Sequence, residues 1–146
     1  MNKIYMVEYF DRWSAPISNV VVEDAEPVGY FSGKKQAEDA IKRCVLAHIP
    51  RNQLRVVEYP LSYSNAQTYV YVLMYEYYYE EESGKAEFYY TFPPCKSELE
   101  CERKRLSLSD TLEYCKTPGK RFYESADGFR VARFAINAYR PVAAFE

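Results

Sequence analysis

The chain has 146 residues, of which 48% are hydrophobic and 27% are charged, and its formal net charge is −2. A chain of this length can bury a core of its own, and this composition excludes disordered, collagen-like and membrane-spanning proteins. The small negative charge gives no long-range attraction for nucleic-acid phosphates.

The N-terminal sequence MNKIYMVEYFDRW lacks the apolar segment of a secretory signal. No apolar run in the chain approaches the ~20 residues that a membrane-spanning helix needs. We therefore expect a cytoplasmic protein. Its cysteines are expected to be reduced thiols and we assign no disulfides, because disulfide frameworks belong to oxidising compartments. They are Cys44, Cys95, Cys101 and Cys115.

The first residues of the chain have the pattern of β-strands. Residues 3–10 alternate with the period of two that a strand requires. The segment 11–27 mixes turn-forming residues with a short β-branched run at 20–22, which predicts a loop that contains one short strand. Residues 28–31 then resume an extended pattern.

A helix is predicted next, with Ser32 as its N-cap and Pro50 just beyond its end. Its apolar stripe consists of Ala37, Ile41, Cys44, Val45 and His48. A strand at 54–59 follows. Residues 60–68 have the composition of a linker.

The second half opens on a tyrosine-rich strand with apolar residues on both faces. One face carries Tyr69, Tyr71, Leu73, Tyr75, Tyr77 and Tyr79, and the other carries Val70, Val72 and Met74. A turn at 80–85 leads to a partner strand at 86–92. A helical region is predicted from 93 to about 116, broken near 107–109, where Ser109 caps a second short helix. The chain ends in a hairpin of 120–124 with 129–139.

Two pairs of segments suggest one plan used twice. IYMVEY (4–9) aligns with VYVLMY (70–75), and RVVEYPL (55–61) aligns with RVARFAI (130–136). We predict an α+β fold with a mainly antiparallel sheet, two or three helices and two β-β-α-β-like halves that arose by internal duplication. The halves are 1–61 and 69–146, joined by a linker at 62–68, and together can form one compact domain. Chance similarity between β-rich segments is the alternative.

The run VGYFSGKKQAEDAI (28–41), preceded by IYMVEYF, resembles small uncharacterised bacterial and phage domains. Those domains have a strand like VYVLxxEY and then a G-x-[FY]-S-x-x-x-A-x-x-A-I segment that opens a helix. The matching residues are Gly29, Phe31, Ser32, Ala37, Ala40 and Ile41. In the second half, the segment 92–95 (FPPC) departs from the pattern. The resemblance implies an α+β fold and a bacterial or phage origin, and it names no active site.

The junction between strand and helix at 29–35 lies where a phosphate-binding loop would lie. Its glycine spacing and the lack of Ser or Thr after the lysines depart from the nucleotide-binding motif. Lysines in a first helical turn oppose the helix dipole. Solvent, a nearby carboxylate at Glu38 or Asp39, or an anionic ligand would compensate them. Binding of a nucleotide or an anionic metabolite is therefore our alternative function, with Ser32, Gly33, Lys34 and Lys35 as the site.

Catalytic and metal-binding residues are sparse. Cys44 and His48 are four residues apart, which suits a shared metal ion or a nucleophile–base pair. The other cysteines match no zinc spacing, so we predict that Cys44 packs in the core. Glu8 and Glu76 lie near comparable strand ends, where glutamates are ordinarily solvated. We expect no enzyme activity, no metal and no cofactor.

The tyrosine-rich strand is the most unusual feature. Aromatic sheets can stack nucleic-acid bases, but the charges among these tyrosines are acidic and repel phosphate. A strand that is apolar on both faces must be covered on both, by the other half, a second copy or a foreign partner. Simple β-propensity with partial burial is the alternative.

We therefore predict a non-enzymatic interaction protein of bacterial or phage origin, which binds a protein partner or itself. The predicted binding residues are Tyr69, Tyr71, Tyr75, Tyr77, Tyr79, Glu76 and Glu80.

Overall fold

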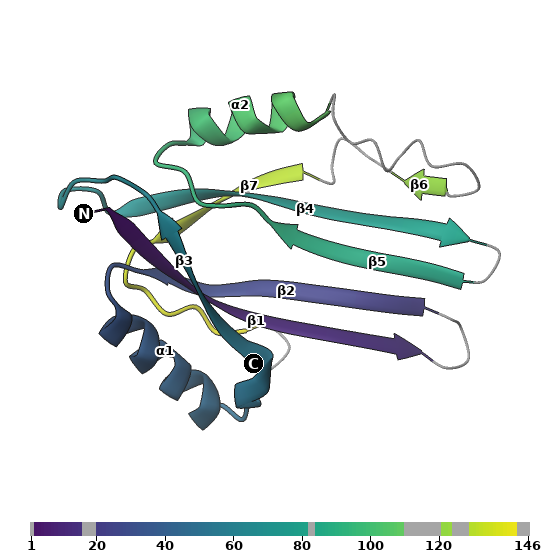
Figure 1. The fold of residues 1–146 in the computed structure, drawn as a ribbon, viewed down its shortest axis with the longest axis horizontal. Coiled ribbons are helices and arrows are strands. Elements are labelled where there is room, and N and C mark those ends of the chain that lie inside the picture. Colours follow the sequence, from purple (N-terminus) through teal and green to yellow (C-terminus); the bar gives the residue numbers. More distant parts are fainter. Residues whose placement is uncertain (1, 16–19, 82–83, 110–120, 124–128, 143–146) are drawn as a thin grey trace.

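Figure 1 shows the computed structural model, which describes residues 2–15, 20–81, 84–109, 121–123 and 129–142. The described part is α+β with a mainly antiparallel sheet and two α-helices, as predicted. None of its helices is long and apolar enough to span a membrane. The elements are β1 (Lys3–Ala15), β2 (Val20–Phe31), α1 (Lys34–Leu46), the 3-10 helix η1 (Arg51–Gln53), β3 (Leu54–Pro60), β4 (Tyr69–Glu81), β5 (Gly84–Thr91), α2 (Glu98–Ser109), β6 (Arg121–Tyr123) and β7 (Phe129–Ala135).

The described strands form one sheet in the order β3-β1-β2-β5-β4-β6, and β7 also pairs with β4. Among the pairs of described strands, only β2 with β5 is parallel. The hairpin predicted near the C-terminus is wrong, because β6 pairs with residues 78–80 of β4 and β7 pairs with residues 69–75. Both strands run antiparallel to β4, so they follow each other along its edge. The short helix predicted after Ser109 lies outside the described residues.

The first hairpin is longer than predicted. β1 continues to Ala15, and β2 is one uninterrupted strand, where the sequence predicted a loop over 11–27. The two strands pair from Tyr5↔Phe31 to Ala15↔Val20, with one irregularity beside Val7. Cross-strand hydrogen bonding therefore outweighs the weak local β-propensity of this acidic segment.

The described strands of the two halves share part of their pairing scheme, although β4 pairs with β6 as well. β1 pairs with β2 and β3, and β4 pairs with β5 and β7. The pairs of β1 with β3, from Lys3↔Pro60 to Tyr9↔Leu54, match those of β4 with β7, from Tyr69↔Ala135 to Tyr75↔Phe129, step by step. In each half the helix begins three residues after a residue paired to the first strand, Phe31 in one case and Cys95 in the other.

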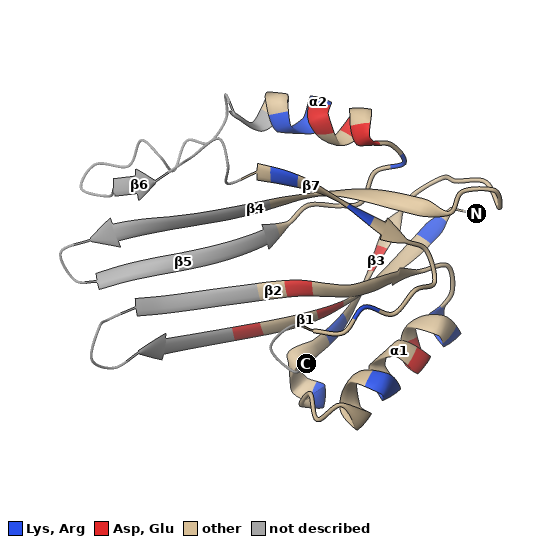
Figure 2. Ribbon diagram, turned by 180° about the vertical axis from the view of Figure 1, so that it is seen from behind, with Lys and Arg blue, Asp and Glu red and all other residues tan. Residues whose placement is uncertain are grey.

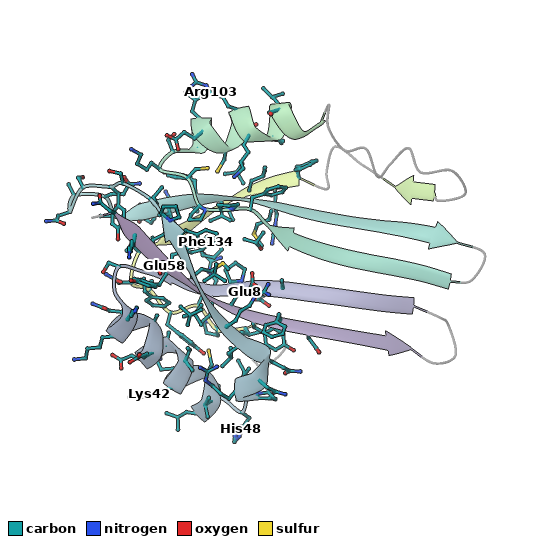
Figure 3. The ribbon with its side chains drawn as sticks, in the orientation of Figure 1. Glu8, Lys42, His48, Glu58, Arg103 and Phe134 are labelled. Carbon is teal, nitrogen blue, oxygen red and sulfur yellow. The ribbon has the colours of Figure 1, made fainter. Side chains whose placement is uncertain are left out.

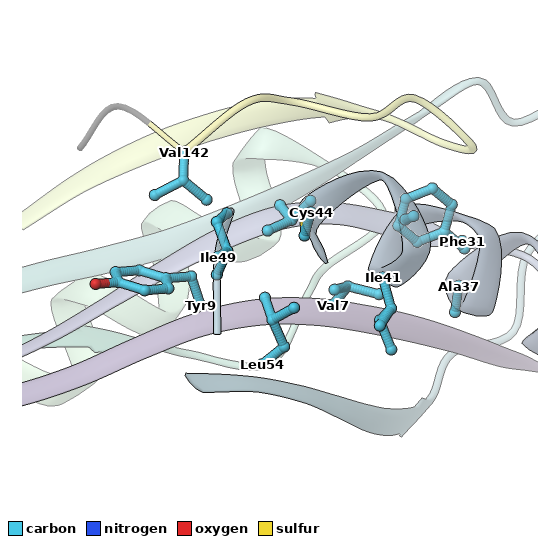
Figure 4. Packing of buried hydrophobic residues seen from close by; sticks show 11 residues of the cluster. Val7, Tyr9, Phe31, Ala37, Ile41, Cys44, Ile49, Leu54 and Val142 are labelled. Carbon is cyan, nitrogen blue, oxygen red and sulfur yellow. The ribbon is translucent and has the colours of Figure 1, made fainter. Parts of the chain in front are cut away.

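Two hydrophobic cores hold these elements together. The outer core lies between α1 and the strands of the first half, and Figure 4 shows it from close by. The inner core joins the two halves, because it combines residues of β1 and β2 with residues of β4 and β7. Its buried members are Ile4, Met6, Tyr30, Tyr63, Val70, Val72 and Phe134.

Each helix covers the strands of its own half. α1 packs on β1 and β2, and α2 packs on β4 and β7, so the helices lie on opposite sides of the molecule (Figure 1). Residues 62–68, the predicted linker, form neither helix nor strand, yet the ring of Tyr63 is buried in the inner core.

Gly29 lies where the chain after β7 approaches β2. The amides of Asn137 and Arg140 donate to the carbonyls of Tyr30 and Val28, both at 2.8 Å. A Cβ atom on Gly29 would lie 2.6 Å from the carbonyl oxygen of Ala138. Only glycine therefore fits this strand position, which explains the first residue of the motif over 29–41.

The buried hydroxyl of Tyr30 has no hydrogen-bond partner among the described residues, while its ring packs edge-on against Phe134 with centroids 5.1 Å apart. Tyr30→Phe should therefore leave the free energy of unfolding unchanged or raise it by about 1 kcal/mol, because it removes only a desolvated polar group. Urea unfolding measures this.

The matched control is Tyr63→Phe, since the hydroxyl of Tyr63 donates to the carbonyl of Lys3 at 3.0 Å. That variant should lose about 1 kcal/mol. A larger loss at Tyr30 than at Tyr63 would contradict the assignment.

Candidate functional site

The C-terminal part of α1 exposes apolar side chains on an open groove. Leu46 is 80% exposed and Val45 is 45% exposed. The groove has a volume of about 710 Å³. We call it the α1 surface; it is lined by Glu38, Ile41, Lys42, Val45, Leu46 and Arg51.

The local sequence explains why these residues face outward. The buried residues of α1 are Ala37, Ala40, Ile41 and Cys44, which follow helical spacing and face the outer core. The predicted stripe is thus correct for three residues and wrong for Val45 and His48. The helix ends at Leu46, and His48 has a left-handed φ of 70°, so the chain turns away before it can cover them.

The rim of the α1 surface is mostly basic. Lys42 and Arg51 lie in its lining and Glu38 is the one carboxylate there. Figure 2 shows acidic residues in the middle of α1 and basic residues toward both ends. Basic residues near a helix C-terminus also favour the helix dipole, so part of this pattern serves helix stability.

An exposed residue of β3 extends the apolar area beside α1. Val56 pairs with Val7, which faces α1 in the outer core, so Val56 points to the same side of the sheet. It is nevertheless 42% exposed. Among the described strands β3 pairs only with β1, so its other edge has no strand beside it.

The near half of the tyrosine-rich strand is covered by the chain itself. Val70 and Val72 lie in the inner core, and Leu73 on the opposite face is also fully buried. Tyr69 is 38% exposed and lies under the guanidinium of Arg133, 4.4 Å from its ring centroid. Tyr71 is half-buried and lines a small cavity of about 250 Å³ with Glu98, Val131 and Arg133.

The far half of β4 lies inside the sheet. β5 pairs with residues 74–81 on one side and β6 pairs with residues 78–80 on the other, so this part of β4 has a strand on both sides. The side chains of the remaining predicted binding residues lie outside the described part, and their role stays a prediction. These are Tyr75, Tyr77, Tyr79, Glu76 and Glu80.

The predicted anion site is built differently from the expectation. The N-cap of α1 is Gly33, and Ser32 makes no capping bond. The amide of Ser32 donates to the side-chain oxygen of Asn137 at 2.9 Å, and the side-chain amide of Asn137 donates to the Ser32 hydroxyl at 3.0 Å. Asn137, which is distant in sequence, thus hydrogen-bonds both the backbone amide and the hydroxyl of Ser32.

Lys34 and Lys35 are exposed at the start of α1, with no acidic residue in the first turn. Glu58 of β3 supplies negative charge nearby. A hydrogen bond from Lys3 lowers the pKa of Glu58, and Lys34 adds a smaller effect in the same direction. Glu58 thus partly balances the charge of Lys34.

Cys44 and His48 do not form a nucleophile–base pair. Cys44 is fully buried, and its Sγ lies 4.0 Å from the hydroxyl of Tyr139. Burial raises the pKa of Cys44, which disfavours the reactive thiolate. His48 is exposed beyond the helix end. Within the described ranges no three His, Cys, Asp or Glu side chains are placed to hold a metal ion.

Glu8 was expected to be solvated, but it is buried and forms an ion pair with the partly exposed Arg55. Glu8 is 2% exposed, and Arg55 Nε donates to its Oε1 at 2.6 Å. Figure 3 labels Glu8 among the strands of the first half. Burial raises the pKa of Glu8, and Arg55 opposes this shift. Arg55 also lies over the ring of Phe10, 4.9 Å from its centroid.

The equivalent positions in the second half, Met74 and Arg130, give a sequence signal for this ion pair. Glu8↔Arg55 corresponds to Met74↔Arg130, where the Arg130 guanidinium lies 3.8 Å from the Met74 sulfur. The alignment of segment 4–9 with segment 70–75 places Glu8 at the position of Met74. This alignment therefore indicates that Glu8 faces inward, opposite an arginine.

Comparison of the chain with protein-family models, with curated proteins and with solved structures finds no match. The resemblance of residues 28–41 to bacterial and phage domains therefore stays a prediction.

Proposed function

We propose that this is a non-enzymatic interaction protein whose α1 surface binds an acidic, apolar segment of a protein partner. The exposure of Leu46 beside Val45 over an open groove carries the proposal. Large apolar side chains gathered on one surface mark interaction sites more often than single exposed ones do.

The charge of the rim selects the partner chemistry. Lys42 and Arg51 flank the apolar floor, so a segment with Asp or Glu beside its apolar residues would pair with them. An amphipathic helix laid in the groove has this pattern. Burial of a leucine or valine side chain on binding contributes about 1.5 to 3 kcal/mol.

We propose further that the two halves arose by duplication in a bacterial or phage protein of the cytoplasm. The matching strand registers support the duplication. A single half would leave its share of the inner core exposed, so pairing two halves in one chain favours folding. The far half of β4, with Tyr75, Tyr77 and Tyr79, remains a second proposed contact surface.

A peptide-display selection tests the α1 surface directly. The wild-type chain should enrich peptides that combine apolar residues at helical spacing with Asp or Glu. Leu46→Asp should lower the affinity for these peptides at least tenfold, while thermal unfolding stays unchanged because the side chain is exposed.

Leu99→Asp is the matched control, because Leu99 on α2 is 60% exposed and lies on the other helix. It should bind the selected peptides like wild type. Equal binding by the Leu46 variant, or no enriched peptides, would refute the proposal. Light scattering of the wild-type chain shows whether a second copy of the chain is the partner instead.

A further inference from the structure

The outer face of α2 exposes leucines beside acidic residues. Leu99 is 60% exposed and Leu106 is 61% exposed. They are seven residues apart, so they lie on one face of the helix, two turns from each other. The acidic residues of the first turn flank Leu99 and are themselves exposed. We call this face the α2 surface; it consists of Glu98, Leu99, Glu100, Arg103 and Leu106.

The start of α2 is held in a fixed conformation. The hydroxyl of Ser97 accepts from the amide of Glu100 at 3.2 Å, and the carboxylate of Glu100 accepts from the amide of Lys96 at 3.2 Å. This reciprocal arrangement is a capping box. Cys101 is fully buried, and Leu99, two residues away along the helix, faces the other way. The α2 surface is therefore preformed, which lowers the entropy cost of binding a partner.

The α2 surface has the chemistry that the α1 surface is proposed to bind. The α1 surface has an apolar floor with Lys42 and Arg51 on its rim, and the first turn of α2 has an exposed leucine between two carboxylates. The order of charges also agrees. Glu38 precedes Lys42 on α1, and the acidic turn precedes Arg103 on α2. If the two helices lie antiparallel, each charge is opposite one of the other sign.

A contact between two α1 surfaces is electrostatically less favourable. Each α1 surface has two cations and one carboxylate in its lining, so two of them carry an excess of positive charge. The α2 surface has two carboxylates and one cation, which balance the charges of one α1 surface. Charge complementarity therefore favours α2 over a second α1 as the occupant of the groove.

The two surfaces lie on opposite sides of the molecule, where Figure 3 labels Lys42 on α1 and Arg103 on α2, so one copy cannot join its own two surfaces. We propose that the α1 surface of one copy binds the α2 surface of a second copy. This inference rests on the proposed function and names the partner. A pair joined in this way leaves one surface of each kind unoccupied, so further copies add head to tail.

Sedimentation velocity over a concentration series tests the self-association. The wild-type mass should rise with concentration beyond that of a dimer. Leu46→Asp and Leu99→Asp should each lower the association constant about tenfold or more, because each places a carboxylate where a leucine would be buried. Thermal unfolding should stay unchanged in both variants, since both side chains are exposed.

An equimolar mixture of the two variants is the decisive sample. The Leu46 variant keeps its α2 surface, and the Leu99 variant keeps its α1 surface. The mixture should therefore form a one-to-one complex with twice the mass of one chain, and it should grow no further at higher concentration. The double variant, which lacks both surfaces, is the matched control and should stay monomeric at every concentration.

Three results would overturn the inference. One is a wild-type chain that stays monomeric, and another is a mixture of the two variants that stays monomeric while wild type associates. The third is a discrete wild-type dimer that persists in Leu99→Asp, since it would show a two-fold contact. A monomeric wild type that still enriches acidic peptides would leave the proposed function standing.

Discussion

Arg55→Met should lower the free energy of unfolding by about 3 kcal/mol, because it leaves the carboxylate of Glu8 buried without its partner. Glu8 is 2% exposed, so water cannot replace the guanidinium without a rearrangement. This loss lies at the lower end of the range for broken buried ion pairs, because the Arg55 side chain is itself 54% exposed. Urea unfolding near neutral pH measures the loss.

Glu8→Met is the matched variant and should stay within about 1 kcal/mol of wild type or exceed it. It recreates the Met74 and Arg130 arrangement of the second half, in which an exposed arginine lies beside a thioether. The arginine can then extend into water, and no buried charge remains. Equal losses of stability in the two variants would show that Glu8 and Arg55 stabilise the fold through each other. That result would contradict the view that Arg55 mainly offsets the cost of burying the Glu8 carboxylate.

The pH dependence follows from the direction of the pKa shift. Burial raises the pKa of Glu8 above its ordinary 4.5, so the folded state binds this proton more tightly than the unfolded state does. The stability that this shift contributes to the folded state is therefore fully present below about pH 4.5, and it is lost as the pH rises through the pKa of Glu8 in the folded state. The stability of wild type relative to Glu8→Met should fall as pH rises from 4.5, and an opposite slope would contradict the assignment.

Phe134→Ala should cost about 3 to 5 kcal/mol, because it opens a cavity between the two halves. The ring is 4% exposed, packs against Tyr30 of the first half and lies under the guanidinium of Arg140, 4.3 Å away. Few side chains of β7 can refill this space, since Ala132 is its nearest inward-facing neighbour. Urea unfolding followed by circular dichroism measures the loss.

Leu99→Ala serves as the control for Phe134→Ala, since a side chain that is 60% exposed should cost less than about 0.5 kcal/mol. Both variants should unfold in one transition, because the inner core is shared by both halves. Two separate transitions, or a loss at Phe134 as small as that at Leu99, would show that the halves are stable without each other.

Local patterns in the sequence predicted much of the fold. Alternation of apolar residues placed β1, β3, β4 and β5 on the chain, and helical spacing placed Ala37, Ile41 and Cys44 in a core. These signals are strong because side-chain period depends only on the local backbone. The short repeated segments also marked the strands that share one register.

Other features depended on contacts between distant residues. Ser32 has the right chemistry for an N-cap, yet Asn137, 105 residues away, takes its hydroxyl and amide. Val45 fits the apolar stripe by spacing, yet it is 45% exposed and none of the described elements covers it. The hydrogen bonds of Ser32 and the exposure of Val45 both depend on which distant residues the fold places nearby. The local sequence does not specify those residues.

The sequence by itself determined the period of β1, β3, β4, β5 and α1, the apolar character of both faces of β4, and the α+β class, because these follow from side-chain order along a regular backbone. Only the tertiary structure decided which faces were covered. It buried Val70, Val72 and Leu73 within the chain and left Leu46 in solvent. The reason is that burial depends on the packing of segments distant in sequence, and the same apolar residue contributes to a core or to a surface according to what lies opposite it.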